Sequence, residues 1–440
     1  MPVSREASAP PFPLSDLTLP QGGTGTVRQV LNGWMRGLVR DLAAIPSSGL
    51  RPPARALYQL TLALAQRQLQ ADPRHLVRIL RQPTLAPLLG TLRRDSGSGS
   101  GEVERSHLVK ELSLLVLLEL AREGLLPAAG VVVPRDDGWP PLRSPEANLL
   151  IDFAPDVEAL LFRPNGLVAH ARGRDFPLWL CAPMAATDAP FTVARPYHPI
   201  VGGVRLALTD NNPLSQFEAH PDKSGNRLDL GGQPLESWLD ALRGAFALVD
   251  RSSPFIGEEM RLVLRLVVPV GWDAERHLSA SYREAVGTIY LTLHPRPMTM
   301  TEALVHEFQH NKLNAALSLD PLLENAFAPL YASPVRPDPR PLHGVLLAVH
   351  AFQPIALLYE SMTADAHPLS RSASFQRRFR DIVRACRSGA KTVLENARPT
   401  ALGAGLLAEM RALDQDLAGI EAMRWPEATP LDVPELPVDG

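Results

Sequence analysis

A strand-like run followed by a long helical run constrains the fold of this chain most strongly. The run GTIYLTL at 287–293 is rich in β-branched and aromatic residues and predicts a strand. The following segment, PMTMTEALVHEFQHNKLNAALSL at 297–319, contains the pattern HExxH, with His306 and His310 four residues apart. On a helix this spacing places both imidazoles on one face, where they can hold one metal ion between them.

The start of this helix has a signal of its own. TMTE at 299–302 has the spacing of a capping box, so we expect Thr299 to be the N-cap and Glu302 to reach back to it. Apolar neighbours such as Leu304 and Phe308 would surround the histidines, exclude water and lower the local dielectric. The pattern therefore predicts a capped, half-buried helix that carries a metal site.

The rest of the chain divides by hydrophobic pattern and predicts an α+β fold. Apolar residues recur at three- and four-residue spacing near the N-terminus, short apolar runs fill the centre, and helical spacing returns at the HExxH segment. The predicted regions are a flexible arm at 1–20, a helical region at 21–129, a β-containing region at 130–298, a helical metal-site region at 299–423 and a Pro-rich tail at 424–440.

Composition narrows the classes of partner. The 440 residues are 45% hydrophobic, which fits a globular protein, and a net charge of −3 gives no general attraction to nucleic acid or to anionic membranes. Cys181 and Cys386 are the only cysteines, which excludes a disulfide framework and a cysteine metal cluster. The first residues lack the apolar core of a signal peptide, and LSLLVLLEL at 113–121 is too short to span a bilayer. We therefore expect a cytoplasmic protein.

Two histidines leave a mononuclear metal site short of at least one protein ligand. A glutamate-type zinc peptidase takes its third ligand from a later helix, and Glu360 in LLYESM stands in such a place. In that interpretation Glu307 is the general base that activates a zinc-bound water. The competing interpretation of Glu360 is an ordinary surface glutamate.

The segment SPVRPDPRPLHG at 333–344 offers other candidates within a few residues. Its prolines exclude a regular helix or central strand, so the charged groups are held by a loop. An arginine in such a loop can pair with a carboxylate in a bidentate way, which suits capture of a dicarboxylate or of an acidic peptide group. The candidate side chains are Arg336, Asp338, Arg340 and His343. Ordinary surface ion pairs and a helix cap are the alternative.

The chain here resembles a known family. The stretch EAVGTIYLTL…EALVHEFQHNKL…LYASPVRPDPRPLHGVLLAVHAF is similar to the HExxH-type 2-oxoglutarate-dependent peptide β-hydroxylases, which are encoded beside ribosomally made natural products. The resemblance is strongest over 285–360, and the pairing of HEFQH with RPDPRPLHG carries it. It implies an Fe(II) enzyme with 2-oxoglutarate and O₂ as cosubstrates, and a precursor peptide whose side chain is hydroxylated at the β-carbon.

The resemblance also implies roles for individual residues. His306 and His310 would be iron ligands with His343 as the third, while Asp338 would restore a two-histidine, one-carboxylate set. Arg340, and after it Arg336, would bind the carboxylate of 2-oxoglutarate. Glu307 would need no base function in an oxygenase, so it would be a hydrogen-bond partner or a further ligand.

One position departs from the family. A histidine is expected at position 347, where this chain has leucine, and His350 either takes over its role or is a buried histidine at helical spacing from His343. The buried alternative is favoured.

Two other classes of function stay open. One is a zinc metallopeptidase of the HExxH type, and the other is a non-catalytic peptide-binding protein with a structural metal. The polar segment 210–232 is either a lid over the site or a surface loop. The basic segment RRFRDIVRAC at 377–386 is either a solvated helix face or a contact surface for an acidic leader peptide.

Overall fold

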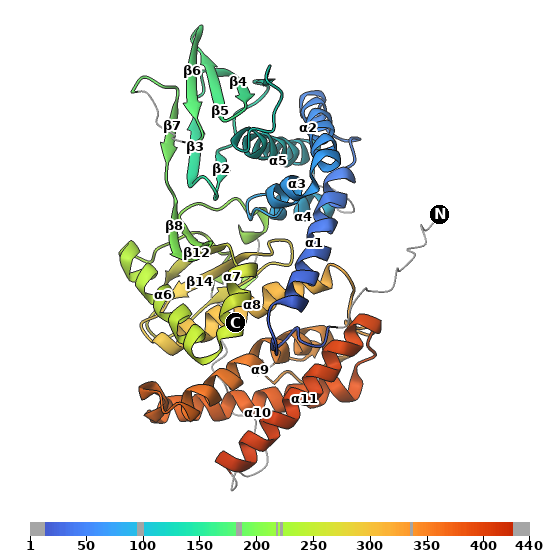
Figure 1. The fold of residues 1–440 in the computed structure, drawn as a ribbon, viewed down its shortest axis with the longest axis vertical. Coiled ribbons are helices and arrows are strands. Elements are labelled where there is room, and N and C mark those ends of the chain that lie inside the picture. Colours follow the sequence, from blue (N-terminus) through green and yellow to red (C-terminus); the bar gives the residue numbers. More distant parts are fainter. Residues whose placement is uncertain are drawn as a thin grey trace.

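The chain has an α+β fold in a computed structural model, with helices at both ends and sheets in the centre (Figure 1). The predicted fold class is confirmed. The structure describes residues 14–94, 101–181, 187–216, 219–220, 223–334 and 338–425.

Helices form the first part of the described chain, as the apolar spacing predicts. They are α1 (Gly25–Ala43), α2 (Pro52–Ala71), α3 (Pro73–Leu80), α4 (Ala86–Arg94) and α5 (Glu102–Arg122). Helix α5 is buried along most of its length because its neighbours α2, α3 and α4 and the strands that follow cover it on several sides. This explains why α5 is apolar on nearly all faces.

Two small antiparallel sheets follow, and the predicted run of short strands is confirmed. One sheet has the order β1 (Val131–Pro134), β4 (Val157–Arg163), β5 (Gly166–Ala171) and β6 (Arg174–Trp179). The other has the order β2 (Leu142–Ser144), β3 (Leu149–Phe153) and β7 (Phe191–Ala194). A two-stranded pair, β10 (Ala219–His220) and β11 (Lys223–Ser224), lies beyond the short helix η2 (Pro213–Gln216).

A mixed five-stranded sheet supports the HExxH helix. Its order is β13 (Ser279–Ala280), β14 (Thr288–Leu293), β12 (Leu266–Trp272), β9 (Val204–Ala207) and β8 (Tyr197–Val201). Strand β12 runs parallel to both β9 and β14, and the crossover from β9 to β12 contains α6 (Leu235–Ser252) and α7 (Pro254–Val263). Every residue of β14 is buried, in agreement with its β-branched and aromatic character.

The run RLVLRLVVPV at 261–270 is rich in β-branched residues but is not a strand throughout. The first three residues complete α7, and the strand begins only at Leu266. Pro254 at the first turn of α7 favours the start of a helix there. This preference outweighs the strand preference of the β-branched residues that follow.

The C-terminal part is helical, with α8 (Pro297–Leu317), α9 (Leu342–Ala364), α10 (Ala373–Asn396) and α11 (Ala401–Arg424). A short pair, β15 (Leu330–Tyr331) and β16 (Arg340–Pro341), precedes α9, and the short helix η3 (Pro368–Arg371) precedes α10. Helices α9, α10 and α11 pack together in the lower part of Figure 1.

The predicted capping box at the start of α8 is wrong. The helix begins at Pro297, its N-cap is Arg296, and no side chain caps it. Proline at the first helical position has φ preset for a helix and lacks the N–H that a cap would satisfy. Thr299 therefore lies in the first turn, and Glu302 bonds with Tyr359 and Arg378 on other helices instead.

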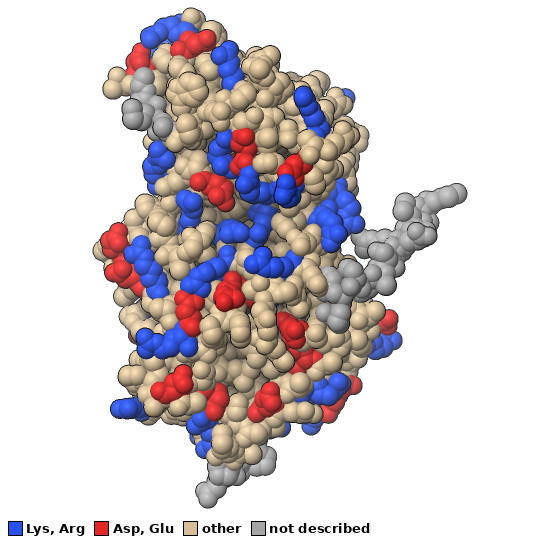
Figure 2. Space-filling view, in the orientation of Figure 1, with Lys and Arg blue, Asp and Glu red and all other residues tan. Residues whose placement is uncertain are grey.

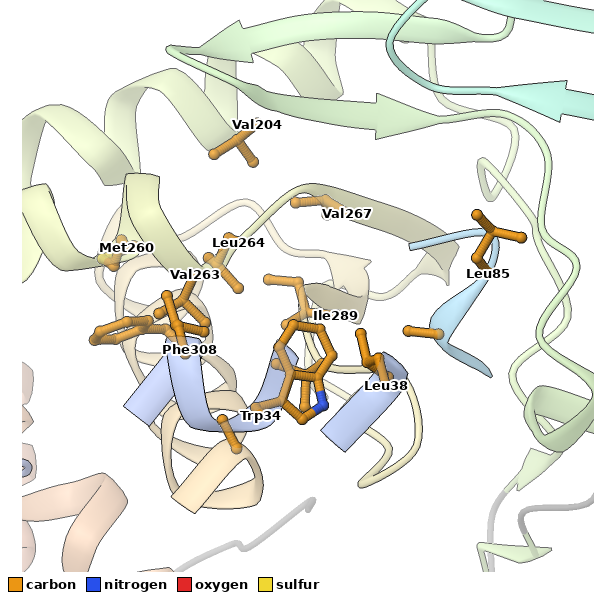
Figure 3. Packing of buried hydrophobic residues seen from close by; sticks show 14 of the residues in the cluster. Trp34, Leu38, Leu85, Val204, Met260, Val263, Leu264, Val267, Ile289 and Phe308 are labelled. Atoms are coloured by element: carbon orange, nitrogen blue, oxygen red, sulfur yellow. The ribbon is translucent and has the colours of Figure 1, made fainter. Parts of the chain in front are cut away.

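Helix α1 packs against the HExxH helix, α8. Trp34 and Leu38 of α1 are buried and lie near Ile289 of β14 and Phe308 of α8 (Figure 3). Burying large apolar side chains of this kind stabilises a fold by about 1.5–3 kcal/mol each. The N-terminal helical part and the HExxH helix thus share one hydrophobic core.

The predicted flexible arm is also partly wrong. Residues 1–13 lie outside the described residues, but Leu14 and Leu17 are fully buried in the main core. The carbonyl of Thr18 accepts a hydrogen bond of 3.1 Å from Gln309 Nε2 of α8. Backbone polar groups rarely enter a core unpaired, so this contact fixes the segment against the HExxH helix. Of the predicted tail at 424–440, residues 426–440 lie outside the described ranges.

One described helix, α9, is long and apolar enough to cross a membrane by length and composition. In the structure, 72% of the most apolar stretch of this helix is buried inside the protein, which is the pattern of a core helix.

Candidate functional site

A cavity of about 840 Å³ extends along α8 and collects most of the residues that the sequence singled out. His306, Glu307 and His310 line it from α8, and Arg340 and His343 line it from the start of α9 and the strand before it. Arg336, the remaining predicted site residue, lies outside the described residues. A volume of this size is typical of a small-molecule or cofactor site.

His306 and His310 face the cavity side by side, one helical turn apart. Their ring centroids are 4.3 Å apart and the rings stand at 83° to each other. Burial, together with the nearby His343, lowers the pKa of His310 to about 4, so its ring is neutral at pH 7. Its buried Nδ1 has no hydrogen-bond partner among the described residues. A neutral imidazole with an unsatisfied buried nitrogen is the form that accepts a metal ion.

His343 reaches the same cavity from the first turn of α9. Its backbone N–H donates to Ala326 O at 2.8 Å, and its ring centroid is 5.4 Å from that of Phe327. Burial and then the positive charge of Arg283 lower the pKa of His343. Over the described parts of the chain, however, no three His, Cys, Asp or Glu side chains are close enough to one another to hold a metal ion. The structure brings His343 to the wall of the site without completing a three-ligand set.

Glu307 lies on the cavity wall and is held in place by the edge of the mixed sheet. Ser279 Oγ of β13 donates to Glu307 Oε1 at 2.7 Å. One turn later, the Asn311 amide oxygen accepts a bond of 2.6 Å from Gly287 N, and its Nδ2 donates to Glu307 O at 2.9 Å. These bonds fix the register between α8 and β14, and with it the direction of the HExxH side chains.

The cavity also contains an arginine that the sequence did not single out. Arg283 lines the cavity near His343, and its Nη2 donates to Leu317 O at 2.9 Å. Within the described residues it has no ion pair, whereas Arg340 Nε lies 2.9 Å from Asp338 Oδ2. Arg283 follows Tyr282 and precedes the strand-like run GTIYLTL. No motif surrounds it, so there was no reason in the sequence to single it out.

A group of ionic and aromatic side chains builds the wall beyond His306. Arg378 of α10 binds Glu302 of α8 in a bidentate way, with its Nη2 2.7 Å and its Nε 3.0 Å from Glu302 Oε2. The Tyr359 hydroxyl donates to the same carboxylate. The Phe352 ring lies beside the HExxH helix, with its centroid 4.8 Å from that of His306. The Arg378 guanidinium lies over the Phe352 ring, 6.0 Å from its centroid.

This arrangement changes the interpretation of the basic segment at 377–386. Arg378 lines the cavity and is not part of a solvated face, while Arg377 is exposed and Arg384 lies 3.9 Å from Glu421. The segment therefore divides between the cavity, the surface and a helix contact, because successive helical residues point in different directions.

Glu360, the third ligand expected for a zinc peptidase, is engaged elsewhere. Its two carboxylate oxygens accept bonds of 2.5 and 2.7 Å from Arg424 of α11, and it is not among the residues that line the cavity. Its neighbour Tyr359 does face the cavity. On a helix the residue after a cavity-lining one points about 100° away, and Glu360 follows that rule.

The departure from the family at position 347 has a structural counterpart. Leu347 lines the cavity one turn after His343, so an apolar side chain occupies the place where a histidine is expected. His350 is fully buried outside the lining, and burial lowers its pKa well below the usual value. The interpretation of His350 as a buried histidine is confirmed.

The polar segment 210–232 does not cover the cavity in the part that is described. Its first residues are tied to the body of the protein, where Asn211 Nδ2 donates to Thr84 O and to Glu111 Oε1, each at 2.9 Å. Asn212 Nδ2 donates to the Tyr290 hydroxyl at 3.1 Å. None of the described residues of the segment lines the cavity. Residues 217–218 and 221–222 lie outside the described residues.

No model of a known protein family matches this chain, and no curated protein matches it either.

Proposed function

We propose that the protein is an Fe(II)- and 2-oxoglutarate-dependent oxygenase that hydroxylates a side-chain β-carbon of a ribosomally made precursor peptide. The observation that carries this proposal is that His306, His310 and His343 line one cavity together with an arginine that has no carboxylate partner among the described residues. The carboxylate that a zinc peptidase would need from α9, Glu360, is bound to Arg424.

The residues fit an iron site at the histidine pair. Two imidazoles on one helix face suit a divalent transition metal, His310 is neutral, and its buried Nδ1 has no hydrogen-bond partner among the described residues. His306 and His310 would hold the ion, and His343 would join them as the third ligand. Bound there, iron would supply the redox chemistry and the open coordination positions that 2-oxoglutarate and O₂ require.

The arginines account for binding of the cosubstrate. One carboxylate of 2-oxoglutarate needs a cation near His343, and Arg283 lines the cavity there without an acidic partner in the described chain. Arg340 lies on the same wall and its ion pair with Asp338 is largely exposed, so the pair holds Arg340 only weakly. Arg283 and Arg340 together would fix the orientation of the dicarboxylate.

The remaining walls would position the peptide and exclude water. The cavity is larger than a dicarboxylate requires, and Phe352 and Leu347 provide apolar surface beside the histidines. Ser279 holds Glu307 as a hydrogen-bond acceptor, so this carboxylate would orient its neighbours or the peptide and needs no base function. The overall reaction would convert peptide C–H, 2-oxoglutarate and O₂ to peptide C–OH, succinate and CO₂. A cytoplasmic location belongs to the same proposal.

The decisive experiment is anaerobic loading of the purified apoprotein with Fe(II), followed by 2-oxoglutarate and then O₂, with succinate as the readout. We expect succinate from the wild type, and at least about a hundredfold less from His306→Ala and from Arg283→Gln. Arg377→Gln, on the exposed face of α10, serves as the matched arginine control. Peptide cleavage that continues without O₂ and disappears in Glu307→Gln would instead establish a zinc peptidase. Tight metal binding with neither reaction would indicate a structural metal.

A further inference from the structure

A group of arginines lies at the junction of α1, α3 and α7, away from the cavity. Arg81 follows α3 and donates from its Nη2 to Leu262 O near the end of α7. Arg265 stands three residues after Leu262, between α7 and β12, and Arg28 lies in the first turn of α1. Helix α1 packs against both α3 and α7, which brings the three arginines to one place. We call Arg28, Arg81 and Arg265 the junction arginines.

The junction arginines have little acidic compensation. Among the described residues no ion pair joins any of them to a carboxylate, although neighbouring Arg261 is paired with Asp250 at 2.5 Å. Glu146 is the nearby acid, and it only partly offsets the group. Burial and then the positive charge of Arg265 lower the pKa of Arg81 to about 10. Like charges held together in a partly desolvated place raise the free energy of the unliganded protein, and a bound anion would relieve this.

The surface around the junction is rich in positive charge. In Figure 1 the junction of α1, α3 and α7 lies in the middle of the molecule, and the same part of the face in Figure 2 carries a concentration of Lys and Arg. The turn between β8 and β9 contains Gly202 and Gly203, and Gly203 lies against the side chain of Arg265. A Cβ atom at position 203 would lie 2.8 Å from Arg265 Nη1, so a larger residue there would displace the guanidinium.

We propose that the junction arginines form a docking surface for an acidic segment of a partner polypeptide. Guanidinium groups pair with carboxylates in a bidentate way, and this group offers the exposed Arg28 beside the partly exposed Arg81 and Arg265. Glu146 within the group and a net charge of −3 disfavour a continuous polyanion such as nucleic acid, but they tolerate a short segment with spaced carboxylates. This docking surface is independent of the reaction proposed for the cavity.

The test is fluorescence anisotropy of the full-length protein with a fluorescein-labelled twelve-residue peptide of alternating Asp, Glu and Gly. We expect binding at low salt that weakens at least about tenfold in the double variant Arg81→Gln/Arg265→Gln and is lost at high salt. Arg377→Gln, which removes an exposed arginine elsewhere, should bind like the wild type. Because Arg81 is partly buried, Arg28→Glu provides a second variant that leaves the core intact, and it should weaken binding as well.

Three outcomes would overturn the proposal. The first is no binding of the acidic peptide at low salt. The second is equal binding by the wild type and by both junction variants. The third is displacement of the peptide by inorganic phosphate at equal concentration, or tighter binding of a twelve-nucleotide DNA strand, either of which would assign the surface to phosphate groups.

Discussion

Lys312 Nζ lies 2.6 Å from Glu259 Oε2, and the two side chains are 0% and 1% exposed. The pair joins α8, two residues after His310, to α7. The Lys312 ammonium also lies 4.9 Å from the Phe308 ring centroid and 3.4 Å from Thr18 O. The HExxH helix is thus held on its rear face by a buried ion pair, which fixes α8 against rotation.

Removing one partner of this pair should be costly. We expect Lys312→Met to lower the free energy of unfolding by about 3–5 kcal/mol, because Glu259 would stay buried without its counter-charge. Urea unfolding followed by circular dichroism measures the change. The double variant Lys312→Met/Glu259→Leu, which removes both charges, should recover most of the loss. Equal stability of Lys312→Met and the wild type would mean that water reaches the pair.

Glu409 should make stability depend on pH. Its carboxylate accepts backbone N–H bonds from Thr18 and Leu19 at 2.8–2.9 Å, and burial raises its pKa to about 7 from an ordinary value of 4.5. Because the folded protein holds this proton more tightly than the unfolded chain, Glu409 contributes its full stability below pH 4.5. That contribution is lost as the pH rises toward about 7. Urea unfolding at several pH values between 4.5 and 8 measures the loss.

The matched variant for this prediction is Glu409→Gln, which cannot titrate. Buried histidines such as His310 and His350 act in the opposite sense, because their lowered pKa values make the folded state lose stability as the pH falls. Subtracting the profile of Glu409→Gln from that of the wild type removes these other groups. Identical pH profiles for the two proteins would show that Glu409 does not titrate in this range.

Local sequence signals predicted the elements of the site well. The strand at Thr288–Leu293 and the helix carrying His306 and His310 follow from β-branched runs and from helical spacing, both of which act over a few residues. The same is true of Arg340 and His343, which share one short segment with the start of α9. His306, Glu307, His310, Arg340 and His343 line one cavity, so the sequence predicted these five of its ionisable groups correctly.

Long-range contacts explain what the sequence did not reveal. Arg283 belongs to the cavity because the mixed sheet places it beside His343, and Arg378 belongs to it because α10 packs across α9. The buried position of Thr18, next to Leu17, depends on hydrogen bonds with Gln309 of α8 and Glu409 of α11, which lie 291 and 391 residues further along the chain. Glu360 pairs with Arg424 for the same reason. No pattern within one segment encodes such pairings.

The pair of Glu302 and Arg378 should stabilise the cavity wall. We expect Arg378→Gln to lower the free energy of unfolding by about 2 kcal/mol, because Glu302 would keep only its bond from Tyr359. Arg378→Lys preserves the charge without the bidentate geometry, so its loss should be about half as large. Thermal unfolding of both variants beside the wild type measures the order. Equal losses for the two variants would show that the geometry of the guanidinium is unimportant here.

Metal binding should depend on the three histidines to different degrees. We expect the apoprotein to bind one Co(II) per chain, with a visible absorption band that titrates to saturation. His306→Ala and His310→Ala should each weaken binding at least about a hundredfold, because the pair on α8 is the arrangement already in place. His343→Ala should weaken metal binding by about tenfold, because this ring reaches the cavity but does not complete a ligand set.

The control is His107→Ala, which removes an exposed histidine far from the cavity and should bind metal like the wild type. Unchanged binding in His343→Ala together with a large loss in Glu307→Gln would give the third position to Glu307.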